Sequence, residues 1–69
     1  MISIVVPVFN EEEGLEGFFT ELSKILPSLD KNHETIFIDD GSTDNSLEIL
    51  KKIASKNKNI RVFSFRKNL

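Results

Sequence analysis

The 69-residue sequence has no cysteine, no tryptophan and no tyrosine, and it has a single histidine, His33. Without cysteine the chain can form neither a disulfide nor a thiolate metal site, and one histidine cannot complete a structural zinc finger. Long apolar runs are also missing. The longest, residues 4–9, contains a proline and is far shorter than the ~20 residues that a membrane span needs. No basic segment precedes it, which is not the pattern of a secretion signal.

The remaining composition is that of a folded chain: 39% of the residues are apolar and 29% are charged, which excludes a disordered tail. The length allows one small domain at most, because a chain of this size buries only about 60% of the surface that its unfolded form exposes. The sequence also stops directly after a predicted strand. We therefore expect residues 1–69 to be the N-terminal part of a larger domain, incomplete by itself.

Charge is divided between the two ends of the sequence. All eleven acidic residues lie in residues 1–48 with only two lysines, whereas residues 49–69 carry seven basic residues and no acidic one. A basic segment can indicate nucleic-acid binding, but this one lacks the interleaved aromatics of a single-strand binder, and the acidic part would repel phosphate. Basic residues near a helix C-terminus are better explained by the helix dipole. No nucleic-acid partner is expected.

Three segments are predicted strands: residues 2–9, 34–39 and 60–65, the last followed by residues 66–69, which leave the sheet. Segment 2–9 is apolar on both faces, which is typical of a buried parallel strand. The other two segments are rich in β-branched and aromatic residues. Pro7 has no N–H to donate, so regular pairing of the first strand should stop there.

The first predicted helix lies between the first two strands. Apolar residues recur at helical spacing over residues 15–29. Asn10 is the expected N-cap, and the glutamates at 11–13 then fall in the first turn, where the helix dipole favours them. Pro27 should end or kink the helix near Leu26, with room for an irregular last turn to residue 29.

The second predicted helix follows a turn at residues 40–44. Ser42 or Thr43 is expected to cap it, with Asp44 in its first turn. Its inward-facing residues are Leu47, Leu50, Ile53 and Ala54. His33 falls in a polar connector before the second strand and is expected to be solvated.

Strands that alternate with helices every ~25–30 residues predict an α/β fold: a βαβαβ unit with a three-stranded parallel sheet and right-handed crossovers. We expect the first strand at the centre, because its faces are the most apolar. The phenylalanines at positions 18, 19, 37, 63 and 65 are expected in the core, although a chain this short must expose some of them. Exposed aromatic surface and an uncovered sheet edge favour self-association, so we expect a homo-oligomer.

Two loops carry the residues expected to bind a ligand. In open α/β sheets ligands bind beyond the carboxyl ends of the strands, where residues 7–11 and 39–42 project. Neither segment has the G-x-G-x-x-G fingerprint or a P-loop, and their carboxylates would repel a diphosphate unless a divalent cation intervenes. An ionised aspartate accepts hydrogen bonds only, which suits the N–H groups of a base or ribose hydroxyls. Phe9 beside it offers a stacking face.

The segment Val6-Pro-Val-Phe-Asn-Glu11, followed about thirty residues later by Ile38-Asp-Asp-Gly-Ser-Thr-Asp44, resembles the opening of family 2 glycosyltransferases of the GT-A fold. It is similar in particular to the dolichol-phosphate mannose synthase and bacterial polyprenyl-phosphate glycosyltransferase branch. The resemblance covers the whole chain and implies the N-terminal half of a Rossmann-like, nucleotide-sugar-binding domain. Phe9 departs from the family, which often has tyrosine there: stacking survives, but any contact through the phenol hydroxyl is lost.

The resemblance also implies which residues bind the nucleotide. The set is Pro7, Val8, Phe9, Asn10, Glu11, Asp39, Asp40, Gly41 and Ser42. In the first segment, Pro7, Phe9 and Glu11 would line the base pocket.

In the second segment, Asp40 would bond the base edge, and Asp39 would support that loop or touch the ribose. Gly41 would allow close backbone approach, while Ser42 is better suited to cap the following helix. No catalytic residue and no metal ligand is expected within the 69 residues.

The family transfers a sugar from a nucleotide diphosphate donor to an acceptor, which in this branch is a polyprenyl phosphate. The resemblance therefore implies that the parent protein is a hexosyltransferase using a UDP- or GDP-sugar and a lipid-linked acceptor. It implies Mg2+ or Mn2+ as cofactor, held by an Asp-x-Asp motif beyond these residues. The implied location is cytoplasmic, with the parent protein at the cytoplasmic face of the membrane, in cell-envelope glycan synthesis.

Two other classes of protein stay open from the residues. One is a receiver-like module in which Asp39 and Asp40 bind a metal ion, although such modules usually place the acidic pair after the first strand and use a lysine near it. The other is a non-catalytic interaction fragment whose sheet edge pairs with itself or with a partner.

Overall fold

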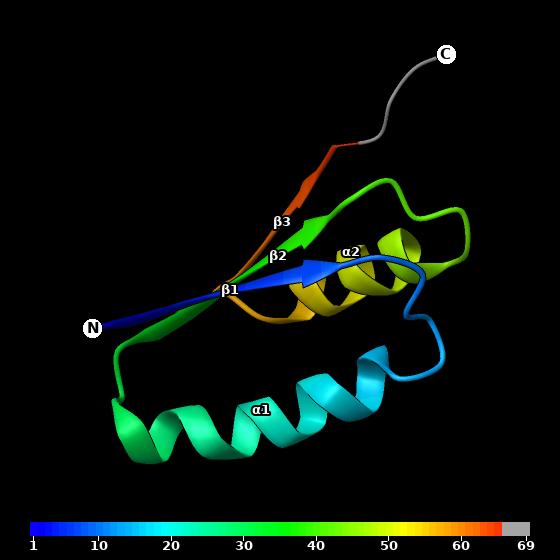
Figure 1. Ribbon diagram of the computed structural model, residues 1–69. Coiled ribbons are helices and arrows are strands. Elements are labelled where there is room, and N and C mark those ends of the chain that lie inside the picture. Colours follow the sequence, from blue (N-terminus) through cyan, green and yellow to red (C-terminus); the bar gives the residue numbers. More distant parts are fainter. Residues whose placement is uncertain (66–69) are drawn as a thin grey trace.

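The computed structural model describes residues 1–65. Its elements follow in the order β1 (Ile2–Val8), α1 (Leu15–Leu29), β2 (His33–Asp39), α2 (Ser46–Lys56) and β3 (Ile60–Ser64) (Figure 1). The predicted α/β alternation is confirmed, with strand ends within one residue of the expected ones. The predicted segment 66–69 lies outside the described residues. Within residues 1–65, neither helix is long and apolar enough to cross a membrane.

The three strands are parallel, in the order β1-β2-β3. β2 is therefore the central strand, and the prediction that the first strand is central was wrong. The burial follows this order: every residue of β2, which has a neighbour on both sides, is buried or half-buried, whereas every second residue of the edge strand β1 from Ser3 to Pro7 is exposed. Apolar character on both faces of β1 did not mean burial on both faces.

Both helices cover the same face of the sheet. The chain steps in one direction from β1 to β2 to β3, so two right-handed crossovers place α1 and α2 on one side. The core between them and the sheet consists of Val8, Leu15, Phe37, Leu50 and Ile60. Burying such side chains is the main source of stability in a chain this small.

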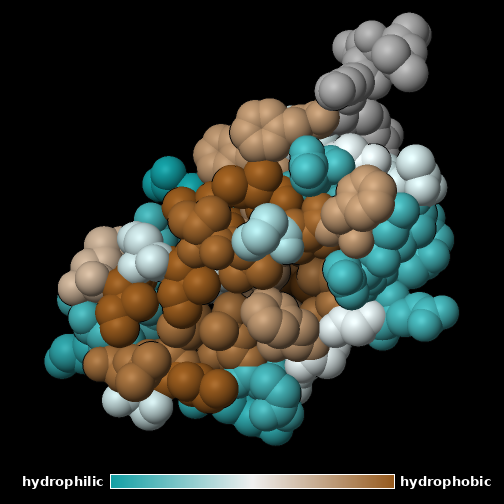
Figure 2. Space-filling model, viewed as in Figure 1, coloured by the Kyte–Doolittle hydropathy of each residue, from teal (hydrophilic) through white to brown (hydrophobic). Residues whose placement is uncertain are grey.

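The opposite face of the sheet has no helix over it within the described residues. By strand alternation and register it carries Val5, Pro7, Ile36, Ile38 and Phe63. Val5 and Phe63 are more than half exposed. The side of the molecule on which β1 and α1 lie is apolar as well: Figure 2 shows apolar side chains gathered over these two elements, with hydrophilic ones at the rim.

Among the phenylalanines expected in the core, only Phe37 is fully buried. Phe19 packs half-buried against the core cluster. The prediction was wrong for Phe18, Phe63 and Phe65, which are 46%, 51% and 62% exposed. Phe63 lies on the sheet face that no helix covers, and Phe18 points into an open pocket between α1 and the edge strand β1.

Pro7 does not end the pairing of β1, contrary to the prediction, because the ladder continues to Val8 opposite Asp39. The Ile2 N–H donates to the Asn32 carbonyl oxygen, and the Val8 carbonyl oxygen accepts from the Asp40 N–H. Even-numbered residues of β1 thus direct their backbone groups toward β2. The nitrogen of Pro7 faces the free edge, where no hydrogen bond is lost.

The helix starts also differ from the predictions. Gly14, not Asn10, is the N-cap of α1, because residues 11–14 form a separate turn in which the Glu11 carbonyl oxygen accepts from the Gly14 and Leu15 N–H groups. Asn45, not Ser42 or Thr43, is the N-cap of α2. The side chains expected as caps are used elsewhere, as described below.

Two further predictions concern the other end of the sheet. α1 does not end at Leu26 but continues through Pro27 to Leu29, as the predicted last turn allowed, because a proline in the last turn removes only one helical hydrogen bond. The prediction that His33 is solvated was wrong: it is the first residue of β2 and is half-buried, and its Nδ1 lies 2.9 Å from Nδ2 of Asn59.

Thr35 in β2 supplies a test of the core. It is 1% exposed, and its hydroxyl has no hydrogen-bond partner among the described residues. A buried unpaired polar group costs about 1–3 kcal/mol. We predict that Thr35→Val, which keeps the shape, raises the free energy of unfolding by about 1 kcal/mol in urea denaturation.

Thr20→Val is the matched control, because the exposed Thr20 hydroxyl donates to the Glu16 carbonyl oxygen at 2.9 Å and its loss should not stabilise the chain. A destabilised Thr35→Val variant would show that the Thr35 hydroxyl is paired in solution.

Candidate functional site

Two loops meet at the carboxyl edge of the sheet: the first loop, residues 9–14, follows β1, and the second loop, residues 40–45, follows β2 (Figure 1). Val8 lies opposite Asp39, and the Asp40 N–H donates to the Val8 carbonyl oxygen at 2.9 Å. Phe9 and Asp40 are thus the next residues beyond two paired strand ends. Phe9 is 56% exposed and Asp40 is exposed, so both side chains are accessible to a ligand.

Asn10 connects the two loops through its side chain. Its Oδ1 accepts hydrogen bonds from the Thr43 N–H at 2.8 Å and the Asp44 N–H at 3.3 Å, and it lies 3.4 Å from the Thr43 hydroxyl. Its backbone has φ 49°, in the left-handed region that asparagine tolerates better than most residues. Asn10 therefore caps the second loop and not its own helix.

Three consecutive N–H groups of the first loop donate to side chains of the second loop and of α2. The Asn10 N–H donates to Ser42 Oγ at 2.9 Å, and the Glu11 N–H donates to Ser46 Oγ at 2.8 Å. The Glu12 N–H donates to Asp44 Oδ2 at 3.2 Å. Asn10 Oδ1 in turn accepts from N–H groups of the second loop, so each loop both donates hydrogen bonds to the other and accepts them from it.

Asp39 is fully buried, and its side chain shares the helix-covered face with Phe37. Its Oδ2 accepts from the Ser42 N–H at 3.3 Å, while its Oδ1 has no partner among the described residues. Gly41 between Asp40 and Ser42 has φ 78°, a conformation that glycine adopts without strain. The carboxylate of Asp39 therefore holds the second loop from the buried side, through the Ser42 N–H.

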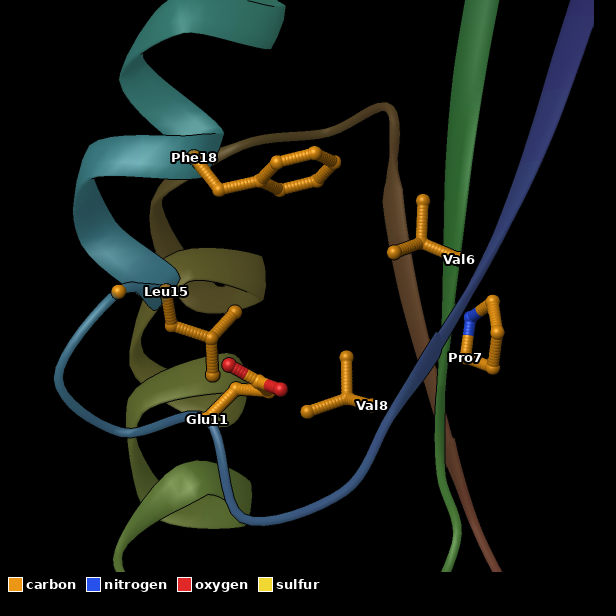
Figure 3. A pocket seen from close by; sticks show the side chains of 7 residues that line it. Val6, Pro7, Val8, Glu11, Leu15 and Phe18 are labelled. Atoms are coloured by element: carbon orange, nitrogen blue, oxygen red, sulfur yellow. The ribbon is translucent and has the colours of Figure 1, made fainter.

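An apolar pocket of about 220 Å³ opens between β1 and the start of α1, lined by Val6, Pro7, Val8, Glu11, Gly14, Leu15 and Phe18 (Figure 3). The side chains of Val6, Val8, Leu15 and Phe18 point into it, and the Glu11 carboxylate lies at one end. The Pro7 ring points to the other side of β1. A single carboxylate beside apolar walls suits a flat ligand that donates hydrogen bonds.

A second, acidic pocket of about 210 Å³ is lined by Asn10, Glu11, Glu12, Glu13 and Asp44. Glu11 lines both pockets, and no basic residue lines either. Phe9 and Asp40, expected to share the base pocket, line neither of the two pockets. An unaccompanied diphosphate would be repelled here.

Sequence reasoning missed several residues of the site. Leu15 and Phe18 were assigned only to a helical stripe, yet their spacing already placed them on the face toward β1. Asp44 and Ser46 were missed as loop contacts. A local signal for Asp44 was present in the sequence. An aspartate often accepts a hydrogen bond from the N–H two residues later and so forms a turn, as Asp44 does here with the Ser46 N–H at 2.8 Å.

Within residues 1–65, no group of three or more histidine or acidic side chains could hold a metal ion. Asp39 is buried on the helix-covered face and Asp40 is exposed, so the adjacent pair does not converge on one cation. The described residues therefore do not fit a bound divalent metal, and they do not favour the receiver-like alternative.

The parallel sheet with its two crossover helices is typical of an open α/β domain, and the candidate site lies beyond the carboxyl ends of β1 and β2. The family model "Glycosyl transferase family 2" matches residues 3–69, and the chain belongs to that family.

Curated relatives are similar over most of this chain. It is 35% identical over 66 residues to the uncharacterized glycosyltransferase YkcC of Bacillus subtilis and 36% identical over 67 residues to the uncharacterized glycosyltransferase sll0501 of Synechocystis, covering 96% and 97% of this chain. It is 41% identical over 54 residues, 78% of this chain, to the undecaprenyl-phosphate 4-deoxy-4-formamido-L-arabinose transferase of Proteus mirabilis. The matched segments span 20%, 21% and 17% of these relatives.

The Asp44 carboxylate gives the site a pH dependence. Burial would raise the pKa of Asp44, but hydrogen bonds from the Ser46 side chain and N–H and from the Glu12 N–H outweigh it and hold the pKa below 3.8. A carboxyl whose pKa is lower in the folded chain stabilises the fold when it is ionised. This stabilisation is fully present above pH 3.8, the ordinary pKa of the group, and is lost as the pH falls through the lowered pKa of Asp44. We predict that the Asp44 carboxyl carbon titrates below 3.8 in an NMR pH series.

Asp44→Asn is the control, because it cannot ionise and should lose less stability between pH 5 and pH 2. The comparison is needed because Asp30 also has a lowered pKa, caused by the Asn32 N–H and the N-terminal ammonium. A titration midpoint at or above 3.8 would contradict the assigned hydrogen bonds.

Proposed function

We propose that this chain is the donor-binding part of a glycosyltransferase that transfers a sugar from a nucleotide diphosphate donor to a polyprenyl phosphate. One observation carries the proposal: in a family 2 chain, an exposed aromatic, Phe9, and an exposed carboxylate, Asp40, follow directly on paired parallel strands. The names of the relatives from Proteus mirabilis and Aeromonas hydrophila, which are undecaprenyl-phosphate transferases, support the acceptor class.

Base recognition follows from the chemistry of these two side chains. An ionised Asp40 accepts but cannot donate, so it suits the imide N–H of uracil or the N1–H and amino edge of guanine. Phe9 offers a stacking face, worth about 1–3 kcal/mol per base in single-strand binders. Glu11, at the end of the apolar pocket, is a second acceptor for the base or the ribose.

The diphosphate half of the donor needs positive charge from elsewhere. No basic residue lines the apolar or the acidic pocket. Family 2 enzymes commonly use a divalent metal ion. We propose Mg2+ or Mn2+, with ligands outside residues 1–65, and we assign no catalytic residue to this chain. Its part is to hold the nucleoside. The proposed cytoplasmic setting, with the parent at the membrane's cytoplasmic face, stays a prediction.

The test is nucleotide binding, measured by 1H–15N NMR of the chain. UDP or GDP is added together with Mg2+, because Mn2+ is paramagnetic and would broaden the signals. Either nucleotide should shift the amide signals of Phe9 and Asp40 more than ATP does. Asp40→Asn puts a donor where an acceptor is needed, so we predict about tenfold weaker binding with an unchanged melting temperature.

Glu21→Gln is the matched control, because Glu21 is an exposed α1 carboxylate that pairs with Lys24 at 3.7 Å, away from both loops. Equal shifts with ATP, or unchanged affinity in Asp40→Asn, would count against nucleotide-sugar binding through Asp40.

We also propose that the chain self-associates through the uncovered sheet face, on which Val5 and Phe63 are more than half exposed. Sedimentation velocity should detect concentration-dependent association of the chain. Phe63→Lys should reduce it, because a charge would be desolvated at the contact, whereas Thr20→Lys on the exposed side of α1 should not. A chain that is monomeric at all concentrations would refute the proposal.

A further inference from the structure

Four polar residues, Asn10, Ser42, Asp44 and Ser46, use side-chain oxygens to bind backbone N–H groups of the two loops. Ser42 and Ser46 are 3% and 0% exposed, and their hydroxyl oxygens accept from the Asn10 and Glu11 N–H groups. Asn10 Oδ1 accepts from the Thr43 and Asp44 N–H groups, and the Asp44 carboxylate accepts from the Glu12 N–H. Ser42 also donates its own N–H to Asp39, so a continuous chain of hydrogen bonds runs from β2 through the second loop to the first.

The backbone shows the same division of roles. Each loop has one residue in the left-handed region, Asn10 in the first and Gly41 in the second. Each of them directly follows an exposed side chain, Phe9 or Asp40. The chain therefore turns immediately after each accessible side chain, and the hydrogen bonds between the loops fix both turns relative to each other.

We infer that Asn10, Ser42, Asp44 and Ser46 are positioning residues, a clamp that holds Phe9 and Glu11 of the first loop in register with Asp40 of the second, so that the nucleoside meets a preformed site. The inference rests on the proposed function. It assigns to Asn10 and Ser42 a role other than the ligand contact expected from the family resemblance.

The physical reason is preorganisation. A loop that is ordered only on binding must lose its conformational freedom at that moment, and the affinity falls accordingly. Here five backbone N–H groups, of Asn10, Glu11, Glu12, Thr43 and Asp44, are already bonded between the loops without a ligand. The side chains of Phe9 and Asp40 are left free because backbone and short side chains do the holding.

Substitution of Asn10 tests the clamp. Asn10→Gly keeps access to the left-handed conformation but removes the Oδ1 acceptor. Asn10→Asp keeps an acceptor in the same place and is the rescue variant. Asn45→Gly is the matched control, because Asn45 lies in the same loop region and its side chain makes no capping hydrogen bond. Ser42→Ala, which removes only the acceptor for the Asn10 N–H, is a second, independent variant.

Two measurements on the full chain separate the clamp from the function. Amide hydrogen exchange without ligand should show joint protection of the five loop amides, lost at Thr43 and Asp44 in Asn10→Gly and restored in Asn10→Asp. Binding of uridine and guanosine, which carry no phosphate to repel the added aspartate, should weaken about tenfold in Asn10→Gly and Ser42→Ala. The affinity for both nucleosides should return to that of the unsubstituted chain in Asn10→Asp and stay unchanged in Asn45→Gly.

Each adverse outcome has one meaning. Lost amide protection with unchanged nucleoside affinity overturns the inference, because the clamp is then structural only. Weak binding in Asn10→Asp with restored protection also overturns it, because the Asn10 amide then contacts the ligand itself. If neither nucleoside binds the unsubstituted chain while the five amides are protected, the proposed function fails and not the geometry of the clamp.

Discussion

The parallel pairing of β1 with β2 is the constraint on which the rest of this structure depends. It sets Val8 opposite Asp39, so both strands end at the same level and the two loops begin side by side. Only then can N–H groups of the first loop reach hydroxyl and carboxylate oxygens of the second. A one-residue shift of register would turn Asp39 out of the core and separate these partners.

The site combines a rigid part and an accessible part. Backbone N–H groups, serine hydroxyls and the Asn10 side-chain oxygen form the hydrogen bonds that hold the loops, and Asp39 supports them from the buried side. Phe9, Asp40 and Glu11 lie at the surface with their side chains available. Such a division suits a binding site, because groups that contact a ligand must be free while their directions are fixed.

The sheet leaves one face and the edge beside β1 uncovered within the part of the chain that the structure describes. Helices cover one face, while the other face exposes Val5 and Phe63, and the outer edge of β1 is free within the described residues. In doubly wound domains the strand order reverses beside the first strand, and the ligand crevice forms at that point. The apolar and acidic pockets lie at that edge, at the carboxyl end of β1.

The sequence by itself determined the five elements, their parallel arrangement and the two loops that carry the candidate site, because periodicity and turn residues are local properties of the chain. It could not determine that β2 is central or that Phe63 is exposed, since strand order and coverage depend on crossover direction. It also misassigned Asn10 and Ser42 as helix caps. A polar side chain bonds whichever N–H group the fold brings to it, and here that group lies more than thirty residues away in the chain.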